Sequence, residues 1–308
     1  MQAFVKRFAP FLSLNVSIDG HKALHDAHRV DAAGNGSFDK AIKAYHAAAG
    51  LGGKQTKMTF VPASFPQMSE AILFMLDQNP DFIAANYAYE PIYTPQDARV
   101  LYDQLKIVSD HLIATKRVIA CSILDHNIGY PVAKEDDKNY CGGSGGMLAF
   151  DTQGKAYPCL RYCPISIGKE KAEKICIGDM QGIYNTPHTA KIRDYLDAIT
   201  LSSQSTPECI NCPVGVGCGW CSAYNYESTG DVNRRVTNIC WAHKGRTLAS
   251  CYYHNKRYLE LRDTTPKAVL LPEKDALQII PREEYEYLLR LQAEAEKVFL
   301  KEGGEDGI

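Results

Sequence analysis

Apolar and polar positions follow a regular order over the first 113 residues of the chain. Three short apolar runs have the length and composition of strands: residues 11–18, 57–61 and 81–90. A segment with helical periodicity comes after each run: residues 38–49, 67–78 and 95–113. Strands that alternate with helices predict a parallel sheet joined by right-handed crossovers. Three such units are only half of a barrel, so we expect the first strand to be a bare edge.

Beyond residue 114 the pattern breaks into shorter pieces rich in glycine and cysteine. Three of these pieces resemble short strands: residues 146–150, 156–157 and 174–177. Longer helices are predicted at 188–199, at 243–262 and in the C-terminal segment, where Pro281 marks the start. The changes of pattern predict four regions: a strand–helix domain at 1–113, a connector at 114–140, a cysteine-rich domain at 141–260 and a helical tail at 261–308.

Composition is that of an ordinary globular protein and argues against two classes of partner. The 308 residues suffice for two domains, with 45% apolar and 23% charged residues. The net charge is −2 and no long run of Lys or Arg occurs, so we expect neither nucleic acid nor an anionic membrane as a partner. No eighteen apolar residues run together, and no signal-peptide cleavage site follows the N-terminal stretch. A reduced, cytoplasmic location is therefore expected.

The eleven cysteines, an odd number, fall mostly into two arrays. Four within thirteen residues, and a fifth further on, form the denser array: Cys209, Cys212, Cys218, Cys221 and Cys240. The upstream array ends in a cysteine followed by proline: Cys141, Cys159 and Cys163. Thiolates at this density hold a soft metal or an iron–sulfur cluster, and spacing alone leaves structural zinc and iron–sulfur equally open. The others are expected to be buried thiols: Cys121, Cys176 and Cys251.

Two sets of motifs resemble one branch of the radical SAM enzymes. The cysteine order closely resembles the SPASM domain that follows the catalytic barrel in that branch: Cys141-x12-Gly154-x4-Cys159, then Cys209-x2-Cys212-x5-Cys218, a nearby Cys221 and a later Cys240. A second set is similar to the fourth strand and following loop of such a barrel: Ser17-Ile-Asp-Gly20, His25-Asp26, Arg29 and Gly34-x-Gly-Ser37-Phe38. The resemblance covers about residues 11–245.

The resemblance implies an α/β fold: the C-terminal half of a partial (βα)6 TIM-like radical SAM barrel, followed by a small cysteine-rich α+β SPASM domain. It also implies two auxiliary [4Fe–4S] clusters. The ligands of one cluster would be Cys209, Cys212, Cys218 and Cys240. The ligands of the other would be Cys141, Cys159 and Cys221. Cys163 is the candidate fourth ligand of that second set; otherwise one iron is left open to solvent or substrate.

The same resemblance assigns roles to residues of the strand–helix domain. Ser17 and Arg29 would contact the carboxylate of S-adenosylmethionine, for which a planar guanidinium is well suited. The alternative is that Arg29 pairs with Asp19 or Asp26. Glu90 ends the third strand, at the edge where parallel barrels place their sites, and is either a catalytic carboxylate or a plain surface one. No metal is expected at three histidines of the loop after the first strand: His21, His25 and His28.

Three departures from the family pattern bear on activity. The catalytic Cys-x3-Cys-x2-Cys loop is absent from this sequence, so either the sequence is a fragment or another chain supplies the first part of the barrel. S-adenosylmethionine and a catalytic [4Fe–4S] cluster are therefore expected only if that part is supplied. Two residues, rather than the usual three, separate Cys218 from Cys221. Leu160 stands where sulfatase-maturing members carry an Asp proposed as the base, which argues against sulfatase maturation.

The activity implied by the resemblance is S-adenosylmethionine-dependent radical modification of a peptide or protein, such as maturation of a ribosomal peptide. This chain alone is expected to be inactive. The implied partners are a peptide or protein substrate and an electron donor such as flavodoxin or ferredoxin. Two alternatives stay open: a non-catalytic iron–sulfur or peptide-binding subunit, and a zinc-stabilised scaffold.

Overall fold

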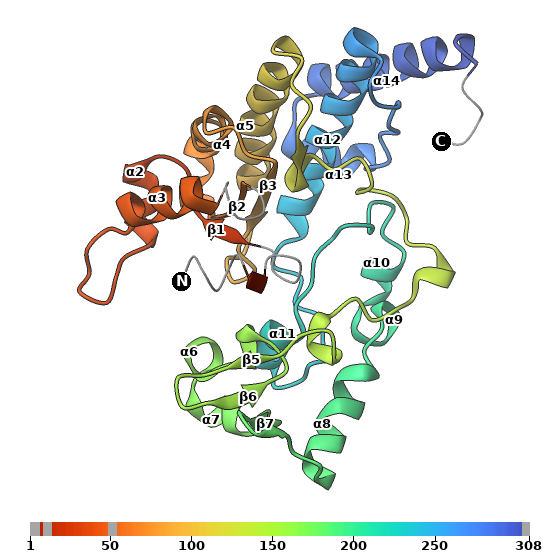
Figure 1. Cartoon of the computed structure of the whole chain (residues 1–308). Coiled ribbons are helices and arrows are strands. Elements are labelled where there is room, and N and C mark those ends of the chain that lie inside the picture. The colour runs from red at the N-terminus through yellow and green to blue at the C-terminus, as the bar shows by residue number, and fades with distance from the viewer. Residues whose placement is uncertain (1–6, 9–13, 49–53, 304–308) are drawn as a thin grey trace. The chain divides into compact units, whose positions relative to one another are not determined.

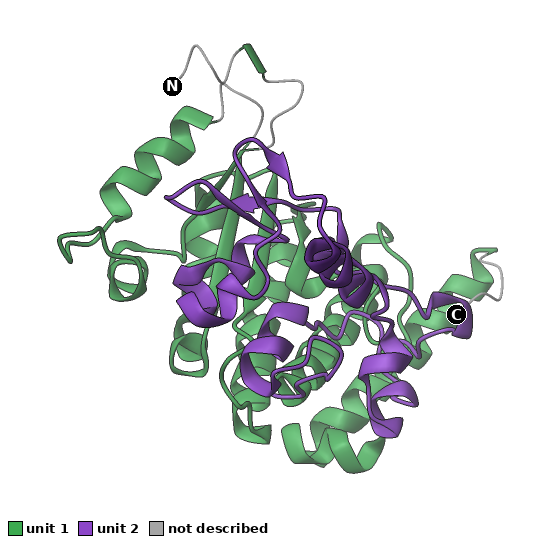
Figure 2. Cartoon of the chain, turned by 90° about the horizontal axis from the view of Figure 1, so that it is seen from below, with its two compact units in different colours: residues 1–129, 239–308 green, residues 130–238 purple. Residues whose placement is uncertain are grey.

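The computed structural model describes residues 7–8, 14–48 and 54–303. The chain divides into two compact units, which Figure 2 shows in different colours. Unit 1 combines residues 1–129 with residues 239–308, and unit 2 comprises residues 130–238. Among the described residues, no helix has both the length and the apolar character needed to cross a membrane.

Unit 1 is built on a parallel sheet with the strand order β1-β2-β3-β4 (Figure 1). The strands are β1 (Asn15–Ser17), β2 (Gln55–Phe60), β3 (Phe82–Tyr87) and β4 (Ala120–Cys121). In β2, Met58 and Phe60 are buried while Lys57 is exposed, which is the period-two pattern of a strand. As far as the described residues go, β1 and β4 are the two edges of this sheet.

Helices follow the strands of unit 1 and make up its C-terminal part. The α-helices are α2 (Lys22–His28), α3 (Phe38–Ala48), α4 (Met68–Asp77), α5 (Pro95–Ala114), α12 (Cys240–Leu261), α13 (Glu273–Ile279) and α14 (Arg282–Lys301). Two 3-10 helices are η2 (Pro62–Gln67) and η3 (Ser122–Leu124). Helix α5 begins where Thr94 and Asp97 cap each other's backbone N–H groups and Pro95 occupies the first turn.

Unit 2 has a smaller, antiparallel sheet with the strand order β5-β6-β7-β8. The strands are β5 (Ala149–Phe150), β6 (Lys155–Tyr157), β7 (Gly178–Asp179) and β8 (Gly182–Ile183). The helices are η4 (Lys134–Asp136), η5 (Gly142–Ser144), η6 (Leu160–Tyr162), α6 (Pro164–Ile167), α7 (Lys169–Glu173), α8 (Pro187–Asp197), α9 (Leu201–Gln204), α10 (Pro207–Ile210) and α11 (Ser222–Thr229). Its apolar core includes Tyr162 and Ile192, and Cys159 and Cys221 pack against that core.

Helix α12 packs along α5 and so joins the C-terminal part of the chain to the parallel sheet. Gly245 lies where the two helices approach closely, since a Cβ on it would fall 2.5 Å from the Ala98 carbonyl oxygen. Further along, Asp110 of α5 accepts hydrogen bonds from Tyr252 at 2.5 Å and from Lys256 at 2.7 Å. A glycine at the contact therefore permits an interface that polar side chains then fix.

Most predicted elements of the two units are confirmed. The helices predicted at 38–49, 67–78, 95–113, 188–199 and 243–262 correspond to α3, α4, α5, α8 and α12. Pro281 is the N-cap of α14, as the sequence predicts. Of the strand predicted at 11–18, residues 15–17 form β1, and residues 11–13 lie outside the described residues.

Other local expectations are wrong. The segment after β1 forms helix α2 rather than a loop, with the His21 side chain accepting a hydrogen bond from the Leu24 N–H at the N-cap. Residues 174–177 form no strand, because the ladder starts only at Gly178. The sequence does not predict β4 or α13, both of which are short.

The compact units also divide the chain differently from the four predicted regions. Residues 114–129 belong with the parallel sheet rather than to a connector, because they supply β4. Helix α12 belongs there too, although the prediction places it in the cysteine-rich region 141–260. Helix α12 belongs to unit 1 because it makes a long contact with α5.

Gly245→Ala should destabilise the chain by about 1 to 3 kcal/mol, because the added Cβ overpacks the contact with α5. The loss should occur although alanine has the better helix propensity. Urea unfolding measures it. The control Glu260→Ala, at an exposed position of the same helix, should change the free energy of unfolding by less than about 0.5 kcal/mol. Equal effects at the two positions would contradict the role given to this contact.

Candidate metal centre

Three of the predicted cysteine ligands come together within unit 2. Cys141 precedes η5, Cys159 precedes η6 and Cys221 is the N-cap of α11. Two of the sulfurs border Gly143: a Cβ on this glycine would lie 3.5 Å from Cys141 Sγ and 3.9 Å from Cys159 Sγ. The thiols of Cys141 and Cys221 both act electrostatically on that of Cys159. We call these three cysteines the thiol triad.

Burial and backbone dipoles act in opposite directions on the triad. The pKa of the Cys159 thiol is raised, chiefly by burial, while the N–H groups of Arg161 and Tyr162 favour its thiolate. The pKa of the Cys221 thiol is also raised by burial, and two N–H groups at the start of α11 oppose the shift. Backbone N–H groups near a sulfur suit a thiolate ligand. By their chemistry these sulfur donors suit a soft metal or an iron–sulfur cluster. Among the described residues, however, no three His, Cys, Asp or Glu side chains are arranged so that they could hold a single metal ion.

Cys163, the candidate fourth ligand, follows Cys159 after the 3-10 helix η6. Its side chain is buried in the apolar core of unit 2, and its Sγ lies 4.0 Å from the Cys159 carbonyl oxygen. Burial and then the Asp151 carboxylate raise the pKa of its thiol. It lines a cavity of about 410 Å³ whose wall also includes the exposed side chains of Leu160 and Ile165. The place of Cys163 in the ligand set stays a prediction.

The second predicted ligand set is only partly within unit 2. Cys209, Cys212 and Cys218 lie in successive turns, linked by hydrogen bonds from the Cys212 N–H to the Cys209 carbonyl and from the Cys218 N–H to the Gly215 carbonyl. Arg235 donates to the Cys218 carbonyl oxygen at 2.9 Å. Cys240 is the first residue of α12 and belongs to unit 1.

The remaining cysteines have mixed surroundings. Cys251 is fully buried, and burial raises the pKa of its thiol to about 12. Burial likewise raises the pKa of Cys121 to about 11. Cys176 is half-buried and donates to the Gly178 carbonyl oxygen at 3.5 Å.

Hydrogen bonds hold together the motif of unit 1 that resembles part of a radical SAM barrel, between Ser17 and Phe38. Arg29 donates to both carboxylate oxygens of buried Asp19, from Nε at 2.5 Å and from Nη2 at 3.0 Å. Asp19 also accepts from the Thr59 N–H at 2.9 Å, which ties the segment to β2. The structure therefore shows the alternative role for Arg29, pairing with Asp19. Ser17 is the exposed last residue of β1.

The rest of the motif closes the turn between α2 and α3. His25 is fully buried, with its Nε2 3.0 Å from Ser37 Oγ. The Asp26 carboxylate accepts from the Phe38 N–H at 2.8 Å. Gly36 leaves room for this carboxylate, since a Cβ there would lie 2.2 Å from Asp26 Cγ. These contacts account for the motif as a structural unit of the fold.

Glu90 lies in the exposed segment after β3. Its carboxylate acts electrostatically on Tyr93: burial raises the pKa of Tyr93 most, followed by Tyr87 and then Glu90. Tyr93 donates to the Ala88 carbonyl oxygen at 2.8 Å, which holds the loop. The role of Glu90 therefore stays a prediction.

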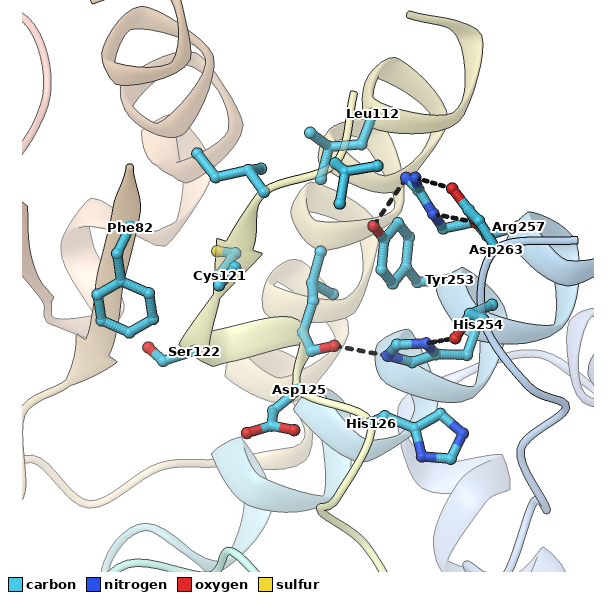
Figure 3. A pocket seen from close by; sticks show the side chains of 15 residues that line it. Phe82, Leu112, Cys121, Ser122, Asp125, His126, Tyr253, His254, Arg257 and Asp263 are labelled. Atoms are coloured by element: carbon cyan, nitrogen blue, oxygen red, sulfur yellow. Dashed lines mark hydrogen bonds and ion pairs between the residues drawn. The ribbon is translucent and has the colours of Figure 1, made fainter. Parts of the chain in front are cut away.

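A cavity of about 340 Å³ lies beside β4 in unit 1 (Figure 3). Arg257 on its wall pairs with Asp263 at 2.8 and 2.5 Å and donates to the Tyr253 hydroxyl at 3.0 Å. His254 is bonded through Nδ1 to Thr264 Oγ1 at 3.0 Å and through Nε2 to the Leu124 carbonyl at 2.8 Å. These groups fasten α12 to its neighbours, and we assign no ligand to the cavity. The sequence carries no motif that predicts it.

Comparisons with known proteins support the fold. No family model matches the sequence, and no curated protein matches it. Among solved structures the chain is similar to anSMEcpe, an anaerobic sulfatase-maturating enzyme of the radical SAM class. Hexahistidine-tagged anSMEcpe with bound AdoMet gives a TM-score of 0.56 at 15% identity, covering 92% of this chain and 72% of that one. Native anSMEcpe with AdoMet and Kp18Cys peptide gives 0.54 at 16% identity, covering 84% and 72%.

At this identity the comparison shows the fold alone. The chain has a mixed α/β architecture with a parallel sheet and many helices, similar to that of a radical SAM enzyme. This confirms the predicted fold in its coarse form. The expectation drawn from Leu160 concerns the reaction and stays a prediction.

The buried, neutral state of His254 should make stability depend on pH. Burial lowers its pKa to about 3 in the folded chain, whereas an unfolded histidine titrates near 6.5. Unfolding below pH 6.5 therefore takes up a proton, so stability is complete above that pH and falls as the pH approaches 3. Between pH 6.5 and pH 5 the loss from this group should be about 2 kcal/mol.

Urea unfolding at several pH values would measure the effect in the native chain and in His254→Gln. Gln keeps a donor and an acceptor but does not titrate, so the slope against pH should be smaller in the variant. An unchanged slope would show that His254 is not responsible.

Proposed function

We propose that this chain holds an auxiliary iron–sulfur cluster on Cys141, Cys159 and Cys221 and takes part in radical S-adenosylmethionine-dependent modification of a peptide or protein. The observation that carries the proposal is the meeting of three thiols from three separate segments of unit 2. The likeness to anSMEcpe supports it, since solved structures of that enzyme contain AdoMet and a peptide.

The chain's own residues have definite tasks in this proposal. The three triad sulfurs bind the cluster, which would supply one-electron transfer at low potential. The N–H groups that follow Cys159 and Cys221 stabilise the thiolates in a half-buried setting. Cys163 stays outside the ligand set, so the fourth position is left to solvent, substrate or another group. The peptide substrate and a small electron-donor protein complete the proposed partners.

A second cluster is proposed on Cys209, Cys212, Cys218 and Cys240. Three of these cysteines lie on successive backbone turns, and x2 spacings are common among cysteine ligands. Loss of these ligands should remove the iron of this cluster.

Cleavage of S-adenosylmethionine is not assigned to these 308 residues alone, because it needs the missing part of the barrel, supplied either by a longer form of this chain or by another polypeptide. The sequence has no Cys-x3-Cys-x2-Cys loop, and the Nε and Nη2 donors of Arg29 are already bound to Asp19. The same two observations favour a second candidate function, a non-catalytic cluster-bearing subunit. The missing part of the barrel, when supplied, would decide between the two.

Iron and sulfide analysis of the anaerobically reconstituted chain tests the cluster. Cys159→Ala and Cys221→Ala should each lose about half of the bound iron, whereas Cys163→Ala and the control Cys176→Ser should retain it. Iron loss in Cys163→Ala would restore Cys163 as a ligand. Zinc in place of iron in the unsubstituted chain would favour the scaffold alternative and sink the proposal.

The purified 308-residue chain, reduced with dithionite and supplied with S-adenosylmethionine, should release no 5′-deoxyadenosine. The physical reason is that these residues contain no Cys-x3-Cys-x2-Cys loop to hold the catalytic cluster. Chromatography with mass detection measures the product, and sustained turnover would overturn this expectation.

A further inference from the structure

Two buried hydroxyl groups form a chain that ends on one sulfur of the thiol triad. Ser222 Oγ lies 3.0 Å from Cys141 Sγ, and the Tyr162 hydroxyl donates to Ser222 Oγ at 2.9 Å. Tyr162 is fully buried and Ser222 is 1% exposed, so water does not compete with either bond. The three groups come from different segments, since Cys141 precedes η5, Tyr162 ends η6 and Ser222 opens α11.

The direction of these hydrogen bonds follows from the chemistry of the sulfur on which they end. Because Tyr162 donates its proton to Ser222 Oγ, the Ser222 proton is free to point to Cys141 Sγ. A thiolate that ligates a metal has no proton and only accepts. Ser222 must then be the donor, and Tyr162 strengthens that donor by polarising it.

The Tyr162 hydroxyl would be unfavourable in its apolar surroundings without the hydrogen bond to Ser222. The ring packs in the apolar core of unit 2, among residues such as Ile192 and Val232. Burying a phenol oxygen there is costly without a hydrogen-bond partner, and Phe would fill the same space. Its partner is Ser222, which adjoins the predicted ligand Cys221 and contacts the predicted ligand Cys141.

We propose that Ser222 and Tyr162 are positioning residues that set the reduction potential of a cluster held by the triad. The inference rests on the proposed function. An O–H···S hydrogen bond withdraws charge from the sulfur and favours the reduced, more negative state of the cluster. The Tyr162–Ser222–Cys141 chain therefore holds the potential above the value that the same sulfurs would give alone.

A redox titration of the reconstituted full chain, followed by electron paramagnetic resonance, tests the proposal. The relevant signal is the one that Cys159→Ala removes. Ser222→Ala should shift its midpoint potential to more negative values, Tyr162→Phe should shift it less in the same direction, and Ser222→Thr should restore it. Iron content, measured on the same samples, should stay at the level of the unsubstituted chain.

Ser144→Ala is the matched control. The Ser144 hydroxyl also bonds to Cys141, but to its carbonyl oxygen at 2.8 Å, so its loss should leave the potential unchanged. A native potential in fully loaded Ser222→Ala would overturn the inference and leave the proposed function intact. Failure of both Ser222→Ala and Tyr162→Phe to bind iron, with Ser144→Ala loaded, would also overturn it, because the hydroxyls would then build the site rather than tune it. An unsubstituted chain without iron would refute the proposed function itself.

Discussion

The cysteines of the thiol triad come from three separate segments of unit 2. Cys159 and Cys221 pack against its apolar core, and burial raises the pKa of both thiols. Without a cation, burial favours the protonated form of these two thiols, which then contribute little more than small apolar side chains. A bound metal reverses that preference, because its charge stabilises the thiolates and its ligand bonds tie distant segments together. The short strands and turns of this unit are consistent with a fold that draws on such a centre.

The strand–helix part of the fold can be predicted from sequence because its signals are strong and local. Apolar runs with period two give β2 and β3, and the Thr94 capping box with Pro95 marks the start of α5. The domain boundary cannot be predicted in this way. Helix α12 buries polar side chains such as His243 and Asn255, which a hydrophobic pattern counts as exposed. Its place in unit 1 depends on contacts with α5, which lies far away in sequence.

The candidate site shows the same limit at closer range. Spacing and family resemblance select Cys141, Cys159 and Cys221, and the structure places them together. Spacing also suggests Cys163, whose side chain is buried in the apolar core of unit 2 after the 3-10 helix η6. Nothing in the sequence singles out Ser222 or Tyr162, since only the folded chain brings their hydroxyls to a sulfur. The Asp19–Arg29 pair shows that residues of a motif can stabilise the fold by hydrogen bonds to each other, without contacting a ligand.

X-ray absorption at the iron and zinc edges of the anaerobically purified chain is the most direct test that sulfur holds iron in unit 2. The account predicts an iron edge with sulfur neighbours and with iron–iron scattering at short range. A zinc edge with four sulfur neighbours, and no iron, would contradict it.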